Sequence, residues 1–135
     1  MKTVRTLLYV ISGLFMLSVV FVFLPWGWLN AFMGWFGPFA YPDDPMVQYT
    51  VKIMLAVFFW IGILMAAAVY RAESNPLFLL IFGLTFVSLA AVVLALVSVY
   101  QLPWLMYGDA VSAVVTGALF LVYRWQVTGQ GLWRP

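Results

Sequence analysis

The most informative segment of the chain is residues 76–100, with the sequence PLFLLIFGLTFVSLAAVVLALVSVY. This run of 25 residues contains no charged side chain. A helix of about 20 apolar residues is long enough to cross the hydrocarbon core of a bilayer. The serines of the run, Ser88 and Ser98, are expected to bond carbonyl groups of their own helix. Residues 76–100 are therefore predicted to form a membrane-spanning helix.

Three further predominantly apolar runs lie at residues 6–24, 46–70 and 106–125. The first has 19 residues and would span about 28 Å as a helix, close to the hydrocarbon thickness. It follows Lys2 and Arg5, as the apolar core of a signal peptide would, but it is longer than the usual core of about 7 to 15 residues. We therefore interpret it as an uncleaved span. The chain is predicted to be all-α, a polytopic membrane protein with a four-helix transmembrane bundle.

Composition supports this fold class and excludes others. Hydrophobic residues make up 67% of the 135 residues and charged residues 7%, against about 25% charged in soluble domains. The length suits about four crossings, so residues 1–135 are expected to form one transmembrane domain. The absence of Cys and His removes thiol and imidazole chemistry and the usual zinc and haem ligands. No metal, cofactor, nucleic-acid partner or enzymatic activity is predicted.

An aromatic segment separates the first two predicted spans. Trp26, Trp28, Phe32, Trp35 and Phe36 lie in it, between Leu24-Pro25 and the glycine-proline pair at 37–38. Aromatic side chains favour the headgroup level of a membrane, and this spacing would place most of them on one side of a short interfacial helix. The segment is interpreted as an interfacial anchor, or alternatively as a lid that covers a ligand cavity between helices.

A turn follows the aromatic segment at residues 41–45, YPDDP. Prolines restrict the backbone on either side of the two acids, and an Asp before Pro45 is a natural N-cap for the next helix. Two adjacent carboxylates alone make a poor cation site. Asp44 is therefore expected to cap the second span.

The distribution of charge predicts the orientation of the chain. With four crossings, the termini and the connection near residue 71 share one side of the membrane. Five of the six cations lie there: Lys2, Arg5, Arg71, Arg124 and Arg134. By the positive-inside rule this side is cytoplasmic. The protein is expected in a membrane of the bacterial inner type, with both termini in the cytoplasm.

Arg124, at the end of the last span, is expected in a short polar tail with Arg134. Two other charged residues, Lys52 and Asp109, fall within the predicted spans. Each follows a proline, Pro45 or Pro103, by six or seven residues, so both are expected at similar depth, about 10 Å from the start of their helices. They are candidates for an intramembrane ion pair. A functional version has Asp109 exchanging Lys52 for a cationic substrate or a proton. The alternatives are a static pair, or a snorkelling Lys52 with Asp109 as a helix N-cap.

Small residues recur at helical spacing in the second and fourth spans. Ala110, Ala113 and Gly117 do so in the fourth span, and Gly62 and Ala66 in the second. Small side chains let helices approach closely in lipid, so these positions predict helix packing within the chain, or alternatively a homodimer surface.

The chain resembles the small four-helix bacterial membrane proteins that include the DoxX-like families. The resemblance is carried by Arg5-Thr6-Leu7-Leu8 with Gly13, by the aromatic loop, by the short second connection, and by Gly108-Asp109 at the start of the last span. It implies an accessory role beside redox or respiratory enzymes. No catalytic motif is carried over by this resemblance.

The expected function is non-enzymatic: an accessory or structural subunit, or a lipid-interacting module, that contacts membrane lipids and a larger membrane complex or a second copy of itself. The alternative is a homodimeric transporter or binder of small amphiphilic or cationic molecules. In that alternative the aromatic residues line the cavity and Asp109 selects for charge.

Overall fold

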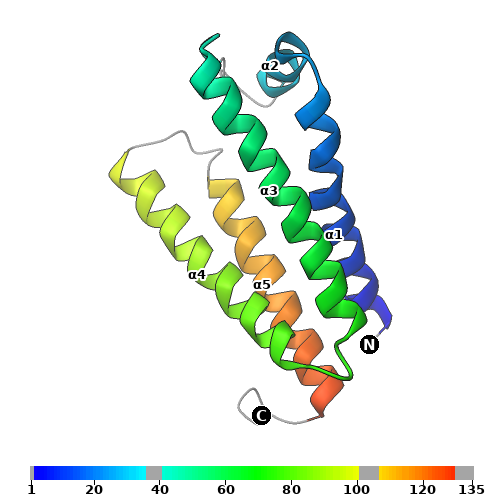
Figure 1. Ribbon diagram of the computed structural model, residues 1–135. Coiled ribbons are helices and arrows are strands. Elements are labelled where there is room, and N and C mark those ends of the chain that lie inside the picture. Colours follow the sequence, from blue (N-terminus) through cyan, green and yellow to red (C-terminus); the bar gives the residue numbers. More distant parts are fainter. Residues whose placement is uncertain (1, 36–40, 101–106, 130–135) are drawn as a thin grey trace. The chain divides into compact units, whose positions relative to one another are not determined.

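The computed structural model describes residues 2–35, 41–100 and 107–129, and every regular element in these ranges is an α-helix (Figure 1). The helices are α1 (Lys2–Phe23), α2 (Trp26–Gly34), α3 (Pro45–Tyr70), α4 (Leu77–Val99) and α5 (Tyr107–Thr128). Four of them, all except α2, are long and apolar enough to cross a membrane. The prediction of an all-α membrane protein with four spanning helices is therefore confirmed.

The first and last spanning helices are longer than the sequence pattern predicted. Helix α1 already begins at Lys2, and α5 continues to Thr128 rather than ending at residue 125. The pattern located only the apolar part of each helix, whereas polar residues without proline or glycine continue it. Gly129 ends α5, because its φ of 57° is the left-handed conformation that glycine adopts at helix ends. Its N–H donates to the Trp125 carbonyl at 3.0 Å.

The chain forms two compact units. One consists of Met1–Ile11 and Met65–Pro135 and is here called the α4–α5 unit, and the other is Ser12–Leu64, here called the α2 unit. Helices α1 and α3 contribute residues to both.

In the α4–α5 unit, α4 and α5 lie side by side in opposite directions (Figure 1). Their backbones meet at two glycines. A Cβ atom on Gly117 would lie 2.9 Å from the Gly83 carbonyl oxygen, and one on Gly83 would lie 3.2 Å from the Gly117 carbonyl oxygen. Ala110 and Ala113 are buried on the same face of α5. The predicted packing of small residues within the chain is confirmed for this part of α5.

Aromatic rings fill the space beside this glycine contact. The ring of Phe120 stacks on Phe82 and Phe86, with centroid distances of 5.4 and 6.3 Å. The largest side chains with almost no exposed surface in this unit are Tyr123, Phe120, Leu8, Met65, Leu79 and Val69. The glycines therefore bring the backbones together, and large side chains around them form the core.

In the α2 unit, α1 and α3 run in opposite directions and approach closely at Gly62. A Cβ atom at Gly62 would lie 2.7 Å from the Ser12 carbonyl oxygen and 2.8 Å from the Met16 backbone nitrogen. Further along the contact, the Ser18 hydroxyl reaches across to the Leu55 carbonyl oxygen at 2.7 Å, while it also lies 2.6 Å from the Phe15 carbonyl oxygen of its own helix. The predicted bonds of Ser88 and Ser98 to carbonyl groups of their own helix are confirmed, at 2.9 and 2.8 Å. Ser18 bonds its own helix in the same way, and its bond to α3 was not predicted.

Candidate functional site

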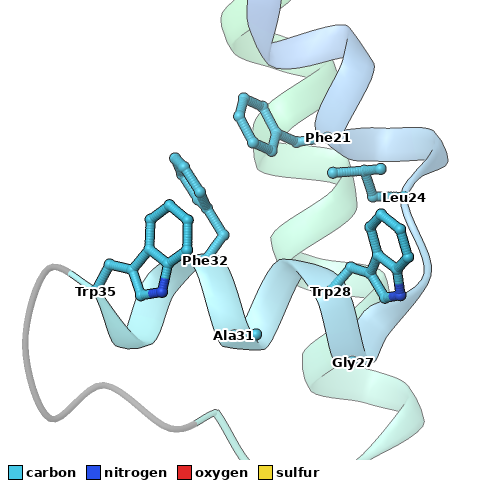
Figure 2. A pocket seen from close by; sticks show the side chains of 7 residues that line it. All are labelled: Phe21, Leu24, Gly27, Trp28, Ala31, Phe32 and Trp35. Atoms are coloured by element: carbon cyan, nitrogen blue, oxygen red, sulfur yellow. The ribbon is translucent and has the colours of Figure 1, made fainter.

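An open apolar groove lies where α1 ends and α2 begins (Figure 2). Its volume is about 400 Å³, within the range of roughly 300–1,000 Å³ typical of small-molecule sites. Every residue that lines it belongs to the α2 unit: Phe21, Leu24, Gly27, Trp28, Ala31, Phe32 and Trp35. None of these side chains carries a charge. The groove can therefore hold an apolar group.

The groove exists because the chain changes direction at a proline. Helix α1 ends at Phe23, and Pro25 has φ −55° and ψ 143°, an extended conformation that does not continue a helix. The Pro25 carbonyl then accepts from the N–H groups of Trp28 and Leu29, at 3.0 and 3.1 Å, and this begins α2. The short helix therefore leaves α1 at an angle and forms one wall of the groove, while Phe21 and Leu24 form another (Figure 2).

Helix α2 has two different faces. The groove face carries Trp28, Ala31 and Phe32, and Trp35, the residue directly after the helix, continues this face. The other face carries Leu29, which is 2% exposed and packs into the unit. This confirms the short aromatic helix predicted from the sequence, although the helix ends at Gly34, and Phe36 lies outside the described residues.

The predicted aromatic residues separate into two groups in the structure. Trp28, Phe32 and Trp35 line the groove, where the Phe32 ring lies 5.0 Å from the Phe21 ring and 6.0 Å from the Trp35 ring. Trp26 faces a different neighbour, since its ring lies 6.1 Å from the Tyr41 ring. Trp26 therefore packs beside the groove and does not line it.

Asn30 connects α2 to the segment before α3. Its side-chain amide donates to the Tyr41 carbonyl at 3.0 Å and accepts from the Tyr41 N–H at 3.0 Å. This pair of bonds joins residues eleven apart in the chain and holds the groove wall in place. The sequence analysis did not single out Asn30, although a lone amide among aromatic residues was a visible signal.

The two acids that follow act in local structure. The Asp44 carboxylate accepts from the N–H groups of Met46 and Val47, at 2.8 and 3.2 Å, so the predicted cap of α3 is confirmed. The Asp43 carboxylate accepts from the Gln48 side chain at 2.6 Å. Among the described residues, no three acids lie close enough to hold a metal ion.

Lys52 and Asp109 lie in different units, Lys52 in the α2 unit and Asp109 in the α4–α5 unit. Their predicted ion pair therefore stays a prediction. Helix α5 already begins at Tyr107, so Asp109 lies within the first turn rather than at the N-cap. The alternative that made Asp109 the N-cap is wrong in this detail, but a carboxylate in the first turn is still stabilised by the helix dipole.

Arg124 was assigned to a polar tail, and this assignment is wrong. The residue lies inside α5 and is 3% exposed. Its position could have been found from the sequence, because Ala113, Phe120 and Arg124 share one helical face at spacings of seven and four.

A cluster of polar groups lies in the α4–α5 unit, near the start of α1 and the end of α5. The Arg5 guanidinium lies 5.8 Å from the centre of the Tyr9 ring, in a cation–π contact. Glu73 and Tyr123 are close enough to act electrostatically on Arg5. These contacts keep several polar groups together at the ends of α1, α3 and α5.

Comparisons with protein-family models, with curated proteins and with solved structures find no match to this chain. The resemblance to the DoxX-like families therefore stays a prediction. The functional argument depends on the geometry of the chain itself.

Proposed function

We propose that this chain is a non-enzymatic accessory or structural protein of a membrane, and that it works through apolar contacts beside the end of α1. The observation that carries the proposal is the uncharged groove between α1 and α2, held in place by the Asn30–Tyr41 bonds. Such a surface suits a lipid or an apolar partner, because hydrophobic burial needs shape and area rather than reactive groups.

The few charged groups support a structural rather than a chemical role. Asp44 caps α3, Asp43 bonds Gln48, and Asp109 lies in the first turn of α5, where the helix dipole favours a carboxylate. Each of these acids has a local structural reason for its position. With no His or Cys in the chain, the imidazole general base and thiol nucleophiles are absent from the sequence.

The proposed location is a bacterial inner membrane with both termini in the cytoplasm. The support is the distribution of Lys2, Arg5 and Arg71 on the side of the termini, together with the positive-inside rule. In this orientation the groove lies in the outer leaflet, at the level where tryptophan is enriched.

The experiment that tests the proposed function is native mass spectrometry of the tagged protein, extracted from its own membrane in lipid nanodiscs. Recovery in a stoichiometric complex with a larger membrane protein is the expected result. Recovery as a monomer or homodimer that carries one tightly held soluble metabolite would contradict an accessory role.

The alternative function is transport or binding of small amphiphilic cations, with Asp109 as the selective group. An acid in the first turn of a spanning helix is the observation that favours it. Asp109→Asn separates the two functions. A transporter variant would keep its fold and lose substrate-driven uptake into vesicles, whereas loss of a structural charge would lower thermal stability and leave no transport to lose.

A further inference from the structure

The groove is continuous with an exposed apolar stripe on α1. Leu14, Leu17 and Phe21 follow one another at intervals of three and four residues, which is one face of α1, and Leu24 follows directly after the end of this helix at Phe23. Leu14 and Leu17 are 62% and 55% exposed, on a helix long and apolar enough to cross a membrane. In a bilayer this stripe contacts acyl chains, and Phe21 and Leu24 extend it directly into the groove.

The two ends of the groove differ in polarity. In Figure 2 the indole nitrogens of Trp28 and Trp35 lie on the side of their rings that faces away from Phe21. Tryptophan at a membrane surface orients in this way, with its ring in the apolar region and its N–H toward the headgroups. The apolar Phe21 side of the groove therefore suits the hydrocarbon region of a bilayer, and the side with the indole N–H groups suits the border with the headgroups.

The floor of the groove is formed by small residues. Ala31 lies between Trp28 and Phe32 in Figure 2, and its small side chain leaves the space between these rings open, while Gly27 precedes Trp28 at the start of α2. A Cβ atom at Gly27 would meet no other atom within 4 Å. The shape thus suits a flexible chain that lies against α2 between aromatic rings.

We propose that this groove binds one acyl chain of a bilayer phospholipid, with the lipid headgroup on the side of the Trp28 and Trp35 indole nitrogens. The inference rests on the proposed function and names the molecule that the uncharged groove holds. The continuity with the α1 stripe favours a lipid over a protein partner, because an acyl chain that already contacts Leu14 and Leu17 reaches the groove without leaving the hydrocarbon. The occupant is a phospholipid that remains in the leaflet, and not a free fatty acid.

The first part of the test uses purified protein reconstituted in vesicles of phosphatidylcholine whose sn-2 chain carries bromine atoms. After extraction in mild detergent, native mass spectrometry is expected to find a brominated lipid on the wild-type chain. Ala31→Phe fills the floor of the groove and should lower lipid retention at least about tenfold. Ala91→Phe, the same substitution at an exposed position of α4, serves as the matched control and should retain the lipid.

The second part of the test needs no variant. Wild-type protein from vesicles of phosphatidylcholine with a photoreactive diazirine on the acyl chain is extracted in mild detergent to remove bulk lipid and then irradiated, and the labelled peptides are mapped. Labelling is expected to concentrate on residues 21–35. Three outcomes would each overturn the inference. They are equal lipid retention in Ala31→Phe and Ala91→Phe, labelling spread evenly over the spanning helices, and a protein-bound fatty acid that the brominated lipid does not displace. None of these readouts depends on recovery of a partner complex. A failure of the lipid-binding inference can therefore be told apart from a failure of the proposed accessory function.

Discussion

The two units of this protein bring helices together by different combinations of contacts. In the α4–α5 unit, Gly83 faces Gly117 and aromatic rings stack beside them. In the α2 unit, Gly62 allows α1 and α3 to approach, and side-chain hydrogen bonds from Ser18 and Asn30 join segments that are distant in the chain. The difference teaches that glycine sets how close two membrane helices lie, whereas polar side chains add bonds between helices that already touch, as Ser18 does, or hold a short segment such as α2, as Asn30 does.

The largest effect is expected at the glycine of the α2 unit. Gly62→Ala would place a methyl group less than 3.0 Å from two backbone atoms, the Ser12 oxygen and the Met16 nitrogen, and neither can move alone. We expect a loss of about 3 kcal/mol in the free energy of unfolding. The measurement is unfolding in mixed micelles of detergent and SDS, followed by circular dichroism. Gly13→Ala is the control, since its methyl group meets no atom within 4 Å, and it should be neutral or slightly stabilising.

A somewhat smaller effect is expected at the glycine pair of the α4–α5 unit. Gly117→Ala would bring a methyl group to 2.9 Å from the Gly83 carbonyl oxygen and should cost about 2 kcal/mol. At Gly83 the nearest atoms belong to the flexible Leu121 side chain, at 2.6 and 2.7 Å, which can rotate. Gly83→Ala should therefore cost less in the same unfolding measurement. An equal loss of unfolding free energy in Gly117→Ala and Gly83→Ala would contradict this prediction, because it would mean that rotation of the Leu121 side chain does not relieve the contact at Gly83.

The connection through Asn30 is expected to contribute less than either glycine. Asn30→Asp keeps an acceptor for the Tyr41 N–H but removes the donor to the Tyr41 carbonyl and adds a charge, at a cost of about 1 kcal/mol. Because the loss is local, hydrogen exchange in peptides that cover α2 should become faster. Gln48→Ala is the control, since it removes an exposed hydrogen bond to Asp43. Unchanged exchange in α2 would mean that the aromatic residues alone hold this helix.

The smallest effect is expected from the hydrogen bond between α1 and α3. Ser18→Ala removes the bond to the Leu55 carbonyl and should cost about 0.6 kcal/mol, the average for such bonds between membrane helices. Ser88 bonds the Thr85 carbonyl of its own helix, so Ser88→Ala should change the free energy of unfolding less. Identical values for the two variants would assign the stability of this contact to Gly62 rather than to the serine.

Part of the candidate site could be predicted from the sequence. Trp28, Phe32 and Trp35 were found because their spacing is that of a helix face, and Asp44 was found because an acid before a proline is a cap signal. Phe21 and Leu24 were missed. Inside an uncharged span, hydrophobicity does not distinguish a residue that lines a groove from one that faces lipid.

The amino-acid sequence alone determines that this is an all-α membrane protein with four spanning helices, because four apolar runs of this length with very few charges suit a bilayer, where every backbone group must bond within a helix. It also determines the helix boundary at Pro25, since proline cannot continue α1. The tertiary structure adds the depth of Arg124 in α5, the backbone contacts of Gly62 and Gly117, and the groove beside α2. These features arise from which faces of the helices meet, and apolar side chains of similar hydrophobicity leave that choice to shape and packing.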